Sequence, residues 1–129
     1  MRSFTQTIQV AMEDLDELNH VNNVRYVQWI QDMAKAHWLS EAGDDLLNNY
    51  FWVVVQHKID YKAPAVLYDY INLKTYVTDT KGVRSTRVVE MYNSETNRLI
   101  VKSETIWCLM SVKTRRPCKI PSEIKTLFN

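Results

Sequence analysis

One helical segment stands in a chain otherwise patterned for strands, and this contrast constrains the fold more than any other feature. Asn22 is a good N-cap, and Gly43 is expected to end the helix in the left-handed conformation. We therefore predict one helix over residues 23–42, which is long for a chain of 129 residues. The apolar positions that fall near one face of this helix are Val24, Val27, Ile30, Ala34 and Trp38.

Runs of alternating, β-branched or aromatic residues flank this helix and predict strands at 4–11, 51–61, 70–78, 83–92 and 98–112. The run Val53-Val54-Val55 predicts that its strand is buried on both faces at its start. Turn signals at 79–82 and 93–97 join consecutive strands in hairpins, and Ser122 is expected to cap a last short helix. The expected fold class is α+β, with a mainly antiparallel sheet covered on one face, in a single domain over residues 1–129.

The composition excludes several classes of protein. With two glycines, Gly43 and Gly82, the chain lacks a dinucleotide-binding loop, a P-loop and a nucleophile elbow. A net charge of +1 argues against binding to nucleic acid, and no apolar run is long enough for membrane insertion or a leader. Cys108 and Cys118 lack the spacing of a zinc site. We expect a cytoplasmic protein with reduced thiols, no metal and no cofactor.

A single helix covers one face of the predicted sheet and leaves the other face open. Trp52 and Trp107 suggest that this second face is not fully solvated, and exposed apolar sheet faces usually mark interfaces. We therefore expect a homo-oligomer, either a homodimer or a dimer of dimers (homotetramer).

Residues 13–23, immediately before the helix, combine carboxylates, an imidazole and carboxamides. The first backbone N–H groups of a helix are unpaired and lie at the positive end of its dipole. Such donors suit the oxyanion that forms during acyl transfer, and a neighbouring carboxylate can attack the carbonyl or activate water. The same composition is typical of a capped turn, so the residue types alone leave both interpretations open.

The block Asp14-Leu15-Asp16, followed by His20-Val21-Asn22-Asn23 and then Tyr26 and Trp29, resembles the signature of hotdog-fold acyl thioesterases. It resembles the 4-hydroxybenzoyl-CoA thioesterase-like branch and is similar to plant acyl-ACP thioesterases. The likeness continues through 60–65, 105–107, 116–117 and 120–121, and so covers nearly the whole chain. It implies a hotdog fold, an antiparallel sheet wrapped around one long central helix. It also implies a cofactor-independent hydrolase of acyl-CoA or acyl-ACP thioesters, as in fatty acid metabolism.

The resemblance also implies roles for four residues of this loop. Asp16, the second Asp of the D-x-D, takes the place of the catalytic general base or nucleophile. The backbone N–H of Asn23 takes the place of the oxyanion donor. His20 and Asn22 are expected to orient water or substrate.

Two positions depart from the pattern of these families. A glycine often precedes the histidine, and here Asn19 stands in its place. Asn is the residue other than glycine that best tolerates the left-handed conformation, so the turn is expected to persist. Leu18 replaces an Asn of the acyl-ACP enzymes, so their wider catalytic network is not carried over.

Further residues are candidates for substrate binding. Lys81, Arg84 and Arg87, with Ser85 between the arginines, are expected to cluster at a hairpin tip. In the resembling CoA-dependent enzymes this region often contacts nucleotide phosphates, although a solvated turn explains the same residues equally well. Core packing is the ordinary interpretation of the aromatic residues, but they could also line an acyl pocket; those considered are Tyr26, Trp52 and Tyr61.

Two other functions stay open on the sequence alone. One is a hotdog hydratase or dehydratase acting on acyl thioesters, and the other is a non-catalytic domain that binds acyl thioesters. His37 and His57 are predicted to be structural, and Cys108 is predicted to be a small buried apolar residue rather than a nucleophile.

Overall fold

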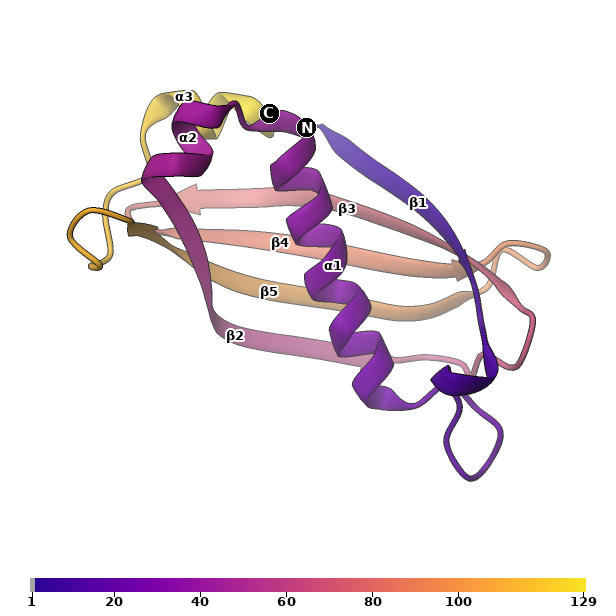
Figure 1. Cartoon of the computed structure of the whole chain (residues 1–129). Helices are drawn as coiled ribbons and strands as arrows, with labels where there is room; N and C mark the ends of the chain where they lie inside the picture. Colours follow the sequence, from indigo (N-terminus) through magenta and orange to yellow (C-terminus); the bar gives the residue numbers. More distant parts are fainter. Residues whose placement is uncertain (1) are drawn as a thin grey trace.

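The computed structural model describes residues 2–129, in which one long helix crosses a five-stranded sheet (Figure 1). The strands lie in the order β1-β3-β4-β5-β2, and all neighbouring strands are antiparallel. The α+β class predicted from the sequence is therefore confirmed. In chain order the elements are β1 (Ser3–Gln9), a 3-10 turn (Met12–Asp14), α1 (Asn23–Glu41), α2 (Asp44–Asn49), β2 (Tyr50–Tyr61), β3 (Tyr70–Lys81), β4 (Arg84–Asn93), β5 (Leu99–Ser111) and α3 (Ser122–Leu127).

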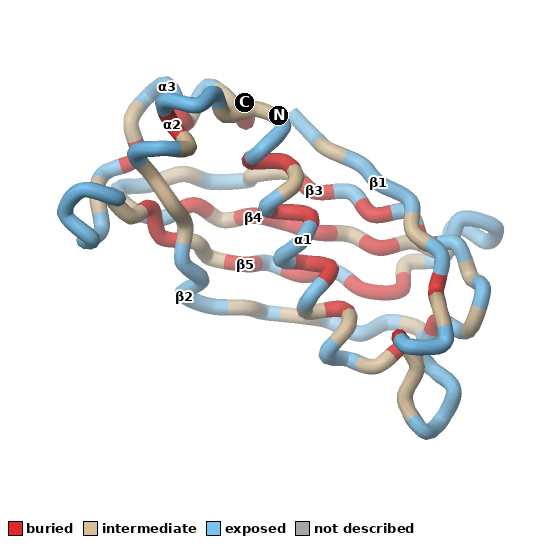
Figure 2. Tube along the Cα trace, viewed as in Figure 1, coloured by how far each residue is buried: buried red, intermediate tan, exposed pale blue. Residues whose placement is uncertain are grey.

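The core lies between α1 and the sheet face that the helix crosses. Buried residues alternate along β3, β4 and β5 and face the buried side of α1 (Figure 2). One apolar cluster surrounds Ile30 and Met33, and a second, around Trp38, includes residues of α2 and α3. Burying each large apolar side chain stabilises the fold by roughly 1.5–3 kcal/mol, so α1 is held mainly by this face.

The start of α1 matches the sequence prediction and its end does not. The side chain of Asn22 caps the helix by accepting a hydrogen bond from the Val24 N–H at 3.0 Å. Gly43 is not left-handed: its φ is −80°, and it is the N-cap of α2, where the sequence predicted a loop. Asp44 and Asp45 occupy the first turn of α2, where negative charge is favourable, and this accounts for the second helix.

Strand β2 lies at the edge of the sheet, which corrects the prediction for its valine run. The exposed fractions of Val53, Val54 and Val55 are 38, 37 and 45%, and the register with β5 shifts between Val54 and Gln56. A short apolar run is typical of a central strand, but it is equally typical of an edge strand that another chain covers. The sequence pattern does not distinguish the two positions. The prediction of burial on both faces is therefore wrong within one chain.

The short segments at the ends of the sheet also differ slightly from the prediction. Strand β3 continues to Lys81, so the turn to β4 is tighter than expected, with Gly82 at a φ of +63°. Helix α3 has Pro121 rather than Ser122 at its N-cap.

A buried polar group lies where α1 crosses β3 and β4. His37 is 0% exposed, and Arg87 Nη1 donates hydrogen bonds to His37 Nδ1 at 2.8 Å and to Thr75 Oγ1 at 3.0 Å. Because Nδ1 accepts, the neutral ring carries its proton on Nε2, which has no hydrogen-bond partner among residues 2–129. Burial, and then the charge of Arg87, lower the pKa of His37 to about 4. The structural role predicted for this histidine fits its position.

We expect the depressed pKa of His37 to make stability depend on pH. The folded value of about 4 lies below the ordinary 6.5, so this contribution is complete above pH 6.5 and is lost as pH falls toward 4. Between pH 7 and pH 5 the loss from this group is about 2 kcal/mol. Urea unfolding of the wild type and of His37→Gln at both pH values measures it. An equal pH dependence in the two proteins would contradict the assignment.

Candidate active site

The loop before α1 folds back on itself and holds a tight turn. Leu15 and Val21 form an isolated antiparallel bridge, and the Asp16 N–H donates to the His20 carbonyl at 2.8 Å. Within this turn Asn19 has a φ of 60°. The expectation that Asn replaces glycine in the left-handed conformation is confirmed.

The carboxylate of Asp16 is half-buried at the centre of this turn. Its Oδ1 accepts hydrogen bonds from the backbone N–H of Leu18 at 2.9 Å and of His20 at 3.2 Å. Within residues 2–129 the Oδ2 of Asp16 accepts no hydrogen bond, and the Asp16 carboxylate forms no ion pair. The turn therefore fixes the direction of the side chain and leaves one oxygen available as a base or nucleophile.

Asp14 has a different task, which the sequence did not reveal. It is 5% exposed; Oδ1 accepts from Arg25 Nε at 2.8 Å, and Oδ2 accepts from the Ala11 N–H at 2.9 Å. Its carbonyl accepts from the Asn22 N–H at 2.8 Å. Asp14 thus ties the loop to the first turns of α1, and both of its carboxylate oxygens are already used.

Asp14→Ala is expected to lower the free energy of unfolding by about 2–3 kcal/mol, because it leaves the Ala11 N–H and the Arg25 guanidinium without their acceptor. Arg25→Gln is the matched control and should cost less, since the Arg25 side chain is 40% exposed. Urea unfolding of both variants measures the difference. A cost below about 0.5 kcal/mol for Asp14→Ala would show that this tie does not hold the loop.

Within residues 2–129, two of the first three backbone N–H groups of α1 have an acceptor and one does not. The N–H of Val24 bonds to Asn22 Oδ1, and that of Arg25 bonds to the Asn22 carbonyl at 2.9 Å. The N–H of Asn23 has no partner among the described residues and lies at the positive end of the helix. The carboxamide oxygen of Asn22 is occupied as the cap, so only its NH₂ group remains for water or substrate.

A cavity of 260 Å³ opens beside this donor, lined by Val21, Asn23, Tyr26, Tyr61, Lys62, Ala63 and Pro64. The two tyrosine rings lie 5.9 Å apart between centroids. The Tyr26 hydroxyl is buried; the Ala65 backbone lies nearby but forms no hydrogen bond of good geometry with it. Burial first, and then the neighbouring groups Asp69, Tyr61 and Asp16, raise the pKa of Tyr26 to about 12. Asp16 itself does not line the cavity.

The four residues expected at the hairpin tip separate into two pairs. Lys81 and Arg84 are exposed and face each other across the turn. Ser85 and Arg87 are 8% and 6% exposed and face the interior, because side chains alternate along β4. Ser85 pairs with Thr80 next to the turn, but neither Ser85 nor Arg87 belongs to an exposed basic tip, and both line a second cavity beneath α1.

His57, Cys108 and Cys118 line neither of these cavities. His57 Nδ1 lies 2.8 Å from Thr105 Oγ1, and burial lowers the pKa of this histidine. Cys108 is buried as predicted, and both it and Cys118 are free thiols.

Residues 2–129 contain no group of three side chains placed to hold a metal ion. In the same residues no helix is both long and apolar enough to span a bilayer.

Comparison with known proteins gives a match to one family over almost the entire chain. Residues 1–128 match the family described as the acyl-ACP thioesterase N-terminal domain. No curated protein matches by sequence.

Solved structures of thioesterases share the fold at low sequence identity. Slr0204, a 1,4-dihydroxy-2-naphthoyl-CoA thioesterase from Synechocystis, is 20% identical with a TM-score of 0.84, covering 98% of this chain and 96% of its own. A 4-hydroxybenzoyl-CoA thioesterase variant bound to 4-hydroxybenzoyl-CoA is 11% identical with a TM-score of 0.89, and both chains are covered completely. The 12:0-ACP thioesterase from Umbellularia californica is 16% identical with a TM-score of 0.83, covering 96% of this chain and 48% of its own. The sheet and its long helix therefore form the hotdog fold that the family resemblance implied.

Proposed function

Because this chain belongs to the acyl-ACP thioesterase N-terminal domain family, a family of thioester hydrolases, we propose that it hydrolyses an acyl-CoA or acyl-ACP thioester to a free acid and a thiol. The observation that carries the proposal is the unpaired Asn23 N–H, which lies beside a cavity and follows the turn that fixes Asp16. A carbonyl oxygen bound to that N–H would have its developing negative charge stabilised.

In the proposed mechanism Asp16 acts on the carbonyl carbon of the thioester. Either its free Oδ2 attacks and forms an acyl-enzyme that water hydrolyses, or it takes a proton from an attacking water. Both routes break the C–S bond, release the thiolate for protonation and give a carboxylic acid. His20 and the NH₂ group of Asn22 are proposed to orient the water or the thioester. Tyr26 and Tyr61 are proposed to contact the substrate in the cavity.

Two features support the proposed carrier groups. Structurally similar thioesterases act on CoA and ACP thioesters, as their names state. In this chain Lys81 and Arg84 are exposed at one hairpin tip and have no acidic partner within residues 2–129. Paired cations of this kind suit phosphates, which both carriers contain.

The proposed activity is tested by thiol release from a panel of acyl-CoA and acyl-ACP substrates. Release of free thiol that is proportional to protein and absent with the buffer alone supports hydrolysis. Tight binding without thiol release would instead favour a non-catalytic acyl-thioester-binding domain. Hydration of an enoyl-CoA without thiol release would favour a hydratase.

We also propose that the chain forms a homodimer in solution through the free edge of β2. The valines that are exposed there lie on a strand with unpaired backbone groups, which favours pairing with a second copy. Analytical ultracentrifugation at micromolar concentration should give about twice the chain mass of 15.2 kDa or a larger multiple of it. Val54→Lys should shift the equilibrium toward the monomer. A wild-type protein sedimenting at one chain mass would contradict the proposal.

A further inference from the structure

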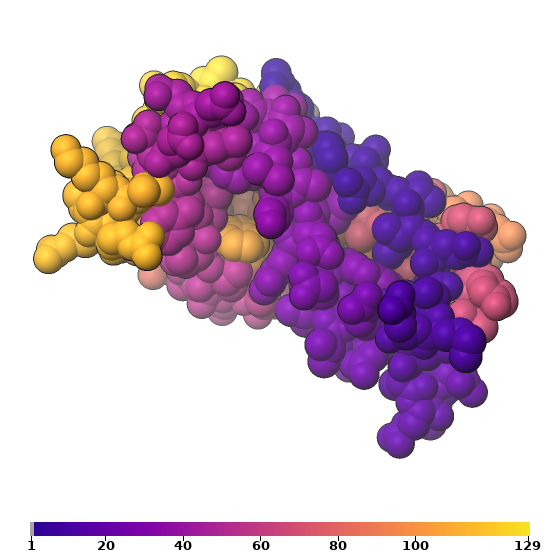
Figure 3. Space-filling model, viewed as in Figure 1, coloured from indigo at the N-terminus to yellow at the C-terminus, as the bar shows by residue number. Residues whose placement is uncertain are grey.

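The larger of the two cavities described lies away from the candidate active site, between α1 and the inner face of the sheet. It has a volume of 350 Å³, within the usual range for small-molecule sites, about 300–1,000 Å³. Figure 3 shows a hollow between α1 and β2 in which atoms of β5 are visible. Five of the cavity's eleven lining residues are aromatic: Trp38, Phe51, Trp52, Trp107 and Phe128. Such a wall suits an apolar ligand body.

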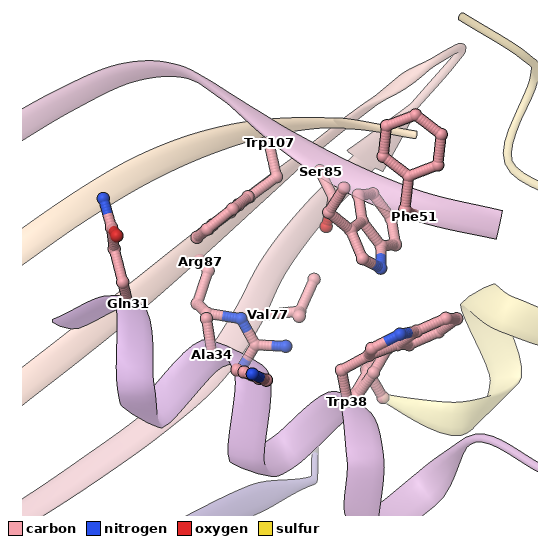
Figure 4. Close-up of a pocket in the computed structure, with 11 residues that line it drawn as sticks. Gln31, Ala34, Trp38, Phe51, Val77, Ser85, Arg87 and Trp107 are labelled. Carbon is pink, nitrogen blue, oxygen red and sulfur yellow. The ribbon is translucent and has the colours of Figure 1, made fainter. Parts of the chain in front are cut away.

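Arg87 gives this apolar cavity a buried positive charge. Its guanidinium lies among the lining side chains, with nitrogen directed into the space between Val77 and Trp38 (Figure 4). Within residues 2–129 the Arg87 side chain donates hydrogen bonds through Nη1 alone, to His37 and Thr75, and both acceptors are neutral. No residue lining the cavity is acidic, and Arg87 forms no salt bridge within residues 2–129. The charge is therefore desolvated but not neutralised.

The energetic consequence favours an anionic ligand. Burial lowers the pKa of Arg87 to about 10, so the group is still charged at neutral pH. The ring of Phe128, 5.2 Å from the guanidinium carbon, offsets part of the lost hydration. A buried cation gains most from a carboxylate that can take two of its N–H groups. Ser85, buried at the same wall, adds a hydroxyl that can donate to that carboxylate.

The cavity and the candidate active site lie along nearly the same side of α1. Ala34, which lines the cavity, is three helical turns from Asn23 and lies on nearly the same side of α1. Three turns correspond to about 16 Å along the helix. A long acyl group, or one that contains rings, can span this length with its thioester at Asn23.

We propose that this cavity binds the far end of the acyl group, and that Arg87 selects acyl groups ending in a carboxylate. The proposal rests on the proposed thioesterase function for the direction of the acyl group. Its basis is the juxtaposition of an aromatic cavity with a buried arginine that has no acidic partner.

Amide probes contain no thioester bond, so they test binding in the cavity separately from the reaction. The probes are the mono-N-butylamide of dodecanedioic acid, the N-butylamide of dodecanoic acid and the N-butylamide of its ω-hydroxy derivative. Calorimetry at neutral pH should give at least about tenfold tighter binding of the carboxylate probe than of the other two. Three of the four tryptophans line the cavity, so binding should also change tryptophan fluorescence.

Variants locate the preference on Arg87. Arg87→Met should remove it, whereas Arg98→Met, at an exposed position just before β5, should retain it. If Arg87→Met does not fold, Gln31→Trp, at an exposed position on the rim, should weaken binding of all three probes. Equal binding of the three probes by the wild type overturns the proposal, and so does a preference that survives Arg87→Met or full binding by Gln31→Trp. Probe binding without thiol release would remove the proposed activity and leave the cavity assignment standing.

Discussion

Asp16→Asn is expected to lower kcat for thioester hydrolysis by about 10²–10⁴-fold and to leave the fold unchanged. The substitution removes the negative charge that either attacks the carbonyl or accepts a proton from water. The amide oxygen can still accept the hydrogen bonds from the N–H groups of Leu18 and His20, so the turn is retained. The loss should therefore appear in turnover rather than in stability.

Rates of thiol release at saturating acyl-CoA, together with thermal unfolding, measure this effect. Glu17→Gln is the matched control, because it removes one carboxylate from the exposed neighbouring position. It should keep nearly all of the activity. An Asp16→Asn protein that retains half of the wild-type kcat would show that another group performs the chemistry.

Asn23→Pro is expected to lower kcat by about 10²–10³-fold, because it deletes the one backbone N–H assigned to the oxyanion. Proline is well tolerated at this position, the first of α1, where the N–H has no partner within the helix. Asn22 has φ −66° and ψ 137°, the extended conformation that a following proline requires. The change thus removes a donor without breaking the helix.

Asn23→Ala separates the backbone from the side chain at the same position. It keeps the N–H and should retain most of the activity, while the helix content by circular dichroism stays equal in both variants. Equal losses in the two variants would assign the effect to the Asn23 side chain. Full activity of Asn23→Pro would show that this N–H does not stabilise the oxyanion.

Local chemistry explains which features the sequence could predict. The start of α1 followed from Asn22, because a cap acts through its own side chain and the next few residues. Asn19 could be placed in the left-handed conformation because the resembling families often have glycine there, and Asn tolerates that conformation best among the other residues. The prediction of how α1 ends was wrong, because Gly43 suits an N-cap as well as a C-terminal stop. The acidic pair after Gly43 favours a second helix.

Features that depend on distant contacts escaped the sequence. Nothing in the loop composition distinguishes Asp14 from Asp16; the difference arises because Arg25 and Ala11 both meet Asp14 in the folded chain. Arg87 belongs to the same class of error. A basic residue near a turn is usually solvated, and its burial follows from the side of β4 on which it falls beneath His37.

The central claim is that the Asp16 carboxylate and the Asn23 N–H act on the same carbonyl group. A crystal structure of Asp16→Asn bound to an intact acyl-CoA tests it directly. The claim predicts the carbonyl oxygen about 2.7–3.1 Å from the Asn23 nitrogen, with the carbonyl carbon facing the side chain at position 16. A thioester bound elsewhere, with its carbonyl out of reach of that nitrogen, would contradict it.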